Sequence, residues 1–166
     1  MTKINKRKIL ISVVGSRKNG SKTDKLAYKV GKMVAETGAV LLCGGLAGVM
    51  HAAAQGAQEA GGLTIGLLPG CDKKAANPYI DIPITTSIGF ARNAIVACAA
   101  DIIVALPGSY GTNSEICYGL VYKRPVIDLG GWKIKGMIKV KNFKEAEKIL
   151  KKLVQKIPNP KLSCPT

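Results

Sequence analysis

Residue types that often signal a metal site, a disulfide scaffold or a membrane span are scarce or poorly placed in this 166-residue sequence. The single histidine, His51, lacks the cysteine or acidic partners of a zinc site, so we expect it to be structural and expect no metal. The five cysteines show no C-x-x-C spacing, which favours free thiols in a reducing cytoplasm. No apolar run reaches the roughly 18 residues of a membrane span, so we expect a cytoplasmic protein without a membrane partner.

Acidic residues are also few, because 10 Asp and Glu stand against 25 Lys and Arg, for a formal net charge of +15. Such a balance is typical of proteins that bind nucleic acids. The basic residues crowd the two ends, however, and residues 33–122 contain only Lys73, Lys74 and Arg92. Aromatic residues make up 5% of the chain, which leaves few platforms for base stacking. We interpret the lysine-rich ends mainly as solvated faces and expect only weak, sequence-blind nucleic-acid binding that vanishes at moderate salt.

Short β-branched runs alternate with helical segments along most of the chain. The expected strands Lys8–Val14 and Ile102–Leu106 are nearly continuous apolar runs, which is typical of strands buried on both faces of a sheet. The pattern predicts an α/β fold, a Rossmann-like doubly wound, mostly parallel sheet with helices on both faces. The other expected strands are 39–43, 63–68, 81–84 and 125–129, and the expected helices are 22–37, 49–60, 88–99 and 113–121.

We expect a single domain over residues 1–166, with its core at about residues 8–129. Residues 132–157 then add a hairpin or edge strand, Trp132–Val140, and a basic helix, Phe143–Lys156, which Pro158 and Pro160 end.

Three glycine-rich loops, Gly15–Ser21, Gly44–Gly48 and Pro107–Thr112, directly follow expected strands and open expected helices. Glycine lets the backbone approach a ligand, and a helix start offers unpaired N–H groups to an anion. Parallel sheets bind ligands at this edge, so three such loops favour a phosphate-bearing ligand where one could be only a turn. The residues expected to bind it are Gly15, Ser16, Arg17, Gly44, Gly45, Gly48, Val49, Met50, Pro107, Gly108, Ser109, Tyr110, Gly111 and Thr112.

The glycine spacing matches neither the G-x-G-x-x-G fingerprint nor the G-x-x-x-x-G-K-[ST] loop, so we do not expect NAD, FAD or a Walker-type ATPase. Arg92 is the only basic residue between Lys74 and Lys123, and its expected helix is otherwise apolar. Because an unpaired buried charge is costly, Arg92 needs an anion, either the ligand's phosphate or Glu115. Two roles stay open for each of two loop residues. Arg17 could reach a phosphate or only face solvent, and Tyr110 could stack on a base or only cover its loop.

Two of these segments carry a family resemblance. Pro107-Gly108-Ser109-Tyr110-Gly111-Thr112-Asn113-Ser114-Glu115 resembles the Pro-Gly-Gly-x-Gly-Thr-x-x-Glu signature of the Lonely-guy phosphoribohydrolases, often mislabelled lysine decarboxylases. Gly44–Met50 is similar to that family's Gly-Gly-Gly-x-x-Gly-Leu-Met-Gly segment.

The resemblance, over about residues 9–129, implies hydrolysis of a nucleoside 5′-monophosphate to free base and ribose 5-phosphate. It also implies catalytic roles for Arg92 and Glu115, no required cofactor, and a homodimer or larger homo-oligomer. Thr112-x-x-Glu115 equally fits a capping box, in which both side chains only satisfy N–H groups at a helix start.

The sequence departs from the hydrolase pattern at four positions. Cys43 and His51 replace glycines of the second loop, Ser109 replaces a glycine of the third, and Asn93 stands where the hydrolases usually carry lysine. The pair Arg92-Asn93 looks as much like two relatives, the molybdenum cofactor carrier protein, which holds a phosphorylated pterin, and DNA-processing protein A, which binds single-stranded DNA. We therefore add Asn93 to the ligand-binding residues. Three functions stay open: a hydrolase as first choice, a non-catalytic carrier of molybdenum cofactor or a nucleotide, and a single-stranded DNA binder.

Overall fold

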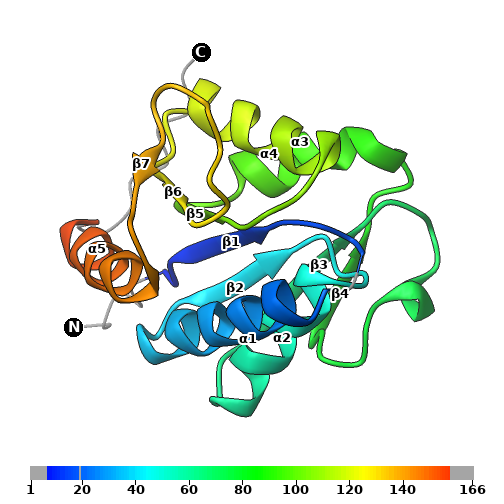
Figure 1. Cartoon of the computed structure of the whole chain (residues 1–166). Helices are drawn as coiled ribbons and strands as arrows, with labels where there is room; N and C mark the ends of the chain where they lie inside the picture. Colours follow the sequence, from blue (N-terminus) through cyan, green and yellow to red (C-terminus); the bar gives the residue numbers. More distant parts are fainter. Residues whose placement is uncertain (1–6, 19, 158–166) are drawn as a thin grey trace, which may run out of the picture.

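The computed structural model describes residues 7–18 and 20–157, and within them seven strands form one sheet (Figure 1). The strand order is β4-β3-β2-β1-β5-β6-β7, and every neighbouring pair is parallel. The strands are β1 (Leu10–Val14), β2 (Val40–Cys43), β3 (Thr64–Leu68), β4 (Ile82–Thr85), β5 (Ile102–Ala105), β6 (Val126–Asp128) and β7 (Ile138–Lys139).

Helices cover both faces of this sheet, which confirms the expected α/β, Rossmann-like fold class. Helices α1 (Ser21–Glu36), α2 (Val49–Glu59) and α5 (Phe143–Lys156) share one apolar core with the sheet, and α3 (Arg92–Cys98) and α4 (Tyr110–Val121) form the other (Figure 1). Two short 3₁₀ turns, η1 (Lys73–Ala75) and η2 (Gly89–Ala91), lie in the connections.

The central strands are buried because their side chains contact helices above and below. Ile11 and Ile102 point into the core with α1 and α2, whereas Val14 and Ile103 point into the core with α3 and α4. The direction of the strand order reverses between β1 and β5, since β2, β3 and β4 follow on one side and β6 and β7 on the other. The loops that leave β1 and β5 therefore diverge to opposite faces and open a crevice at the carboxyl edge.

Two expected helices begin elsewhere. The helix expected at residues 88–99 begins only at Arg92, because Ser87 and Gly89 have φ angles of 59° and 58°, which an α-helix cannot contain. The helix expected at residues 113–121 begins already at Tyr110, so it includes Gly111 despite the poor helix propensity of glycine.

The segment expected as a hairpin or edge strand, Trp132–Val140, forms no hairpin. Only Ile138–Lys139 is a strand, and it pairs in parallel with β6 at the edge of the sheet. Two side-chain contacts hold the connection between β6 and β7 against the sheet. Trp132 Nε1 donates to the Leu106 carbonyl at 3.0 Å, and Lys139 Nζ lies 2.6 Å from the buried Asp128 carboxylate. Helix α5 has the expected bounds, while its predicted stop at Pro158 and Pro160 lies outside the described residues.

The described part of the chain contains no helix that is both long and apolar enough to cross a membrane. Four of the five cysteines are described as free thiols, and the fifth, Cys164, lies outside the described residues.

Helices α1 and α2 pack so closely that their backbones touch, which leads to a test of the fold. A Cβ on Gly31 would lie 1.9 Å from the Ala53 carbonyl oxygen, which cannot move aside without shifting the helix. Gly31→Ala should therefore lower the melting temperature, because overpacking costs about 1–3 kcal/mol and outweighs the roughly 1 kcal/mol by which alanine favours a helix. Gly70→Ala is the control, since a Cβ there meets no atom within 4 Å. Unchanged or higher stability of Gly31→Ala would contradict this packing.

Candidate functional site

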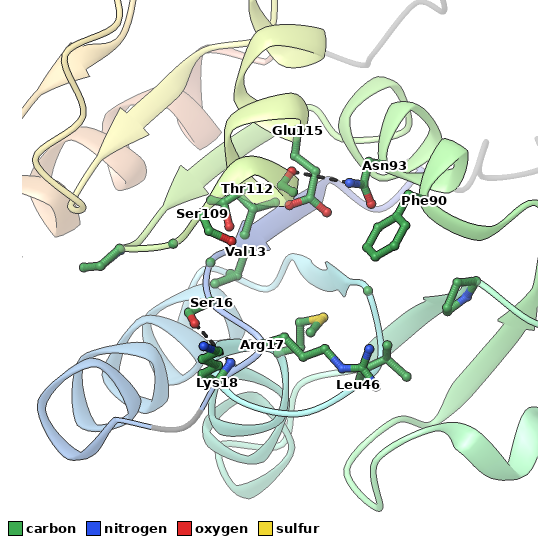
Figure 2. Close-up of a pocket in the computed structure, with 18 of the residues that line it drawn as sticks. Val13, Ser16, Arg17, Lys18, Leu46, Phe90, Asn93, Ser109, Thr112 and Glu115 are labelled. Atoms are coloured by element: carbon green, nitrogen blue, oxygen red, sulfur yellow. Dashed lines mark hydrogen bonds between the residues drawn. The ribbon is translucent and has the colours of Figure 1, made fainter.

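A cavity of about 950 Å³ lies in the crevice at the carboxyl ends of the central strands (Figure 2). Its walls come from the loop after β1, the loop after β2, the start of α3, and the loop that joins β5 to α4. The size falls within the usual range for small-molecule sites. The three glycine-rich loops thus meet around one cavity, as the sequence predicted for a ligand site.

Backbone hydrogen bonds tie the three loops into a single unit. Ser16 N–H donates to the Pro107 carbonyl at 3.0 Å, and Val49 N–H donates to the Ser16 carbonyl at 2.9 Å. Gly48 has a φ of 66°, and a Cβ there would lie 2.4 Å from the Ser16 oxygen. Glycine is therefore required at this position because of both its conformation and the close approach of the first loop.

The start of α4 faces the cavity with its backbone. Ser109 is the N-cap residue and makes no side-chain cap hydrogen bond, and Asn113 N–H donates to the Ser109 carbonyl at 2.9 Å. The N–H groups before Asn113 consequently have no acceptor within the helix. A Cβ on Gly108 would lie 2.2 Å from Thr112 Oγ1, so only glycine lets this loop close over the helix start.

The capping-box interpretation of Thr112 and Glu115 is wrong. Because α4 begins at Tyr110, both residues lie inside the helix, and Glu115 points to α3 instead of back to a cap. Its carboxylate pairs with Arg92.

Arg92 and Glu115 form a buried ion pair on the floor of the cavity. Arg92 Nη1 lies 3.1 Å from Glu115 Oε1, and it also donates to Asn93 Oδ1 at 2.7 Å. The side chains of Arg92 and Glu115 are 8% and 9% exposed. Asn93 is fixed in turn, because its Nδ2 donates to Ser114 Oγ at 3.0 Å. The Arg92 Nε atom is buried and has no hydrogen-bond partner among the described residues.

Glycine at position 44 makes room for this guanidinium. A Cβ there would lie 2.3 Å from Arg92 Nη2 and 2.7 Å from Met50 Sδ. The second loop therefore lines the cavity with its backbone, and the absence of a side chain at Gly44 leaves space for the Arg92 guanidinium.

Burial changes the acid strength of two groups near the pair. It raises the pKa of Glu115 to about 7, even though the nearby Arg92 cation acts in the opposite direction. It raises the pKa of the Cys43 thiol to about 12, so this cysteine is not a thiolate nucleophile at neutral pH.

Most residues predicted to bind the ligand lie around the cavity. Lining residues among them are Gly15, Ser16, Arg17, Gly44, Met50, Arg92, Asn93, Pro107, Gly108, Ser109, Gly111, Thr112 and Glu115. Four predicted residues lie outside the lining: Gly45 and Gly48 shape the second loop, Val49 packs beneath Gly15, and Tyr110 is 92% exposed.

Some residues near the site were not predicted to bind a ligand. The sequence interpretation missed the apolar lining residues Leu46, Pro69 and Phe90. Leu46 lies within the second glycine-rich loop but was not selected, and Pro69 and Phe90 belong to no glycine-loop pattern. His51 makes an edge-on ring contact with Tyr79, with centroids 5.0 Å apart. Within residues 7–18 and 20–157, no group of three or more His, Cys, Asp or Glu side chains could hold a metal ion.

Comparison with known proteins places these features in one family. The sequence profile of the SLOG cluster4 family matches residues 8–159. The molybdenum cofactor carrier protein of Chlamydomonas reinhardtii is 36% identical, over 90% of this chain and 100% of that one, with a TM-score of 0.82. The molybdenum cofactor binding protein of Rippkaea orientalis is 34% identical, over 90% of this chain and 86% of that one, with a TM-score of 0.72.

A more distant similarity concerns the fold alone. DNA processing protein A of Streptococcus pneumoniae is 22% identical over 78% of this chain and 53% of that one, with a TM-score of 0.64. The recognition of the superfamily, with its cofactor-carrier relatives, is thus confirmed. Hydrolase activity and a homo-oligomeric assembly stay predictions.

The buried pair predicts an unusual titration. Because burial raises the pKa of Glu115 to about 7, one glutamate carboxyl ¹³C resonance should titrate near neutrality and be lost in Glu115→Gln. This raised pKa contributes stability below the ordinary glutamate pKa, and the contribution should fade as the pH rises to about 7. Arg92→Met should move the titration still higher, since it removes the neighbouring cation. A Glu115 titration below its ordinary value would show that the ion pair outweighs burial.

Proposed function

The chain belongs to the SLOG cluster4 family, and on this premise we propose that it is a non-catalytic carrier of a small phosphorylated ligand of the molybdenum cofactor type. The ligand enters the cavity at the carboxyl edge of the sheet. Its anionic group faces Arg92 and the start of α4, and no further cofactor is required.

The observation that carries this proposal is the incompletely paired guanidinium in the cavity. Arg92 is 6% exposed, and its Nε has no partner among the described residues. Leaving a buried charged donor unpaired is costly. Arg124 Nε is also unpaired among the described residues but lies outside the cavity lining, so it is the position of Arg92 in the cavity that favours a ligand as the missing acceptor. An anionic ligand supplies this acceptor, and the helix-start N–H groups of α4 favour the same charge.

The surroundings of Glu115 favour binding over catalysis. With a pKa of about 7, Glu115 is protonated in a large fraction of molecules near neutral pH, and its charge is partly engaged by Arg92. A carboxylate in this state is a poor stabiliser of an oxocarbenium-like transition state, which needs a full negative charge close to the sugar. Asn93 also replaces the lysine that the hydrolases usually carry, and it serves here to orient Arg92.

The similarity to carriers extends over nearly the whole chain. The Chlamydomonas reinhardtii protein, described as a molybdenum cofactor carrier, matches 90% of this chain at 36% identity. The family profile matches residues 8–159, which include the cavity, so the same class of cargo is the natural candidate here.

A phosphoribohydrolase is the second candidate, because both residues assigned to catalysis by the resemblance are present and face the cavity. Arg92 and Glu115 lie 3.1 Å apart at its floor. A carboxyl group with a pKa near 7 is also suited to proton exchange at neutral pH.

The carrier proposal predicts a co-purifying pterin. Protein produced in a host that makes molybdenum cofactor should retain a phosphorylated pterin, measured by fluorescence after oxidation and by molybdenum content. Arg92→Met should reduce the retained pterin at least ~10-fold, because a charge-assisted hydrogen bond contributes about 1.5–3 kcal/mol. Arg124→Met is the control, since Arg124 lies outside the cavity lining and donates to the Cys98 carbonyl. Equal retention by both variants, or none by the native chain, would contradict the proposal.

A nucleosidase assay separates the two candidates. The carrier should release no free base from a panel of nucleoside 5′-monophosphates. A hydrolase would release base, and Glu115→Gln would then slow release by at least ~10²-fold. Release that depends on Glu115 would replace the carrier with the hydrolase.

A further inference from the structure

The rim of the cavity carries an aromatic side chain that neither proposed function has used. Phe90 lies in the turn η2, lines the cavity, and is 82% exposed. Figure 2 shows its ring on the α3 side of the opening, with Leu46 from the second loop on the opposite side of this view. A phenylalanine this exposed is not held there by packing against the protein.

The backbone fixes the turn from which this side chain projects. Ser87 has a φ of 59°, which is uncommon for a residue other than glycine and is a mark of local strain. Hydrogen bonds maintain the turn, because Ser87 N–H donates to the Gly70 carbonyl at 3.2 Å and Gly89 N–H donates to the Pro69 carbonyl at 2.9 Å. The chain thus holds Phe90 at the cavity instead of letting it turn into the core.

The cavity has a polar end and an apolar end. Ser109 and Thr112 lie at the start of α4, near the Arg92 and Glu115 pair. Apolar lining comes from Leu46, Pro69 and Phe90, whereas Met50 lies beside Arg92 at Gly44, and the first loop adds Arg17 and Lys18 to the lining. A ligand that fits both ends has an anionic group joined to a flat apolar surface, and aromatic rings pair well with such surfaces by stacking.

We propose that Phe90 is a specificity-determining residue that stacks on the planar heterocycle of the phosphorylated ligand, a pterin or a purine. The inference rests on the proposed function, because it concerns the same cavity. It assigns the phosphate to the end near α4 and the ring to the end near η2.

The test compares probes with and without a ring by isothermal titration. The probes are neopterin monophosphate, guanosine 5′-monophosphate and ribose 5-phosphate, and the variants are Phe90→Ala, Phe90→Tyr and Tyr118→Ala. Tyr118 is the matched control, since it is an exposed aromatic residue outside the cavity lining. Because Phe90 is largely exposed, its removal leaves the core intact.

Phe90→Ala should weaken at least one ring-bearing probe by at least ~10-fold, within the range for one lost stacking contact, and leave ribose 5-phosphate within about two-fold. Phe90→Tyr should restore affinity, and Tyr118→Ala should match the native chain. The probe whose affinity falls more in Phe90→Ala, the pterin or the purine, identifies the ring that stacks on Phe90.

Several results would overturn this assignment. Equal weakening of all three probes would show that Phe90 only shapes the cavity, and unchanged affinity for both ring-bearing probes would leave the carrier proposal standing without the stacking contact. If the native chain binds none of the probes, both proposals fail. A change in sedimentation of Phe90→Ala would identify Phe90 as a subunit contact, and a selective loss of single-stranded DNA binding would identify it as a nucleic-acid platform.

Discussion

The buried ion pair between Arg92 and Glu115 is the interaction on which the rest of the site depends. It joins α3 to α4, which pack on the same face of the sheet, with a distance of 3.1 Å between Arg92 Nη1 and Glu115 Oε1. A buried pair of this kind is costly unless its remaining donors find acceptors. Asn93 supplies one acceptor, while the Nε atom has none among the described residues. This unfinished pairing is the observation on which the proposed binding site rests.

The glycines around the pair are explained by contact distances more than by flexibility. Gly44 leaves space for the guanidinium, and Gly108 lets its loop close over the start of α4. Gly48 combines a positive φ with close approach to Ser16. Replacing any of the three with a larger residue would move a loop or Arg92, so the loop sequences and the ion pair depend on one another.

The sequence predicted the elements that depend on local pattern, and it failed where distant contacts decide. Apolar runs located β1 and β5, and strand-to-loop spacing placed the three glycine loops at one edge. Local pattern also suggested that Thr112 and Glu115 cap a helix, whereas α4 begins at Tyr110 and both residues lie inside it. The pairing of Arg92 with Glu115 was one of the two pairings that the sequence offered for the arginine. Phe90 was missed because it belongs to no motif, and only the strained turn at Ser87 brings it to the cavity.

We propose one cavity with an anion-binding end and an aromatic end, in a family whose similar structures include molybdenum cofactor carriers. The net charge of +15 then serves to attract anionic ligands over a distance, while specificity comes from the cavity. A crystal structure with neopterin monophosphate bound tests this account most directly. The account predicts the phosphate between Arg92 and the start of α4, with the pterin against Phe90. A phosphate bound instead to the lysines of α1 or α5, with the cavity empty, would contradict it.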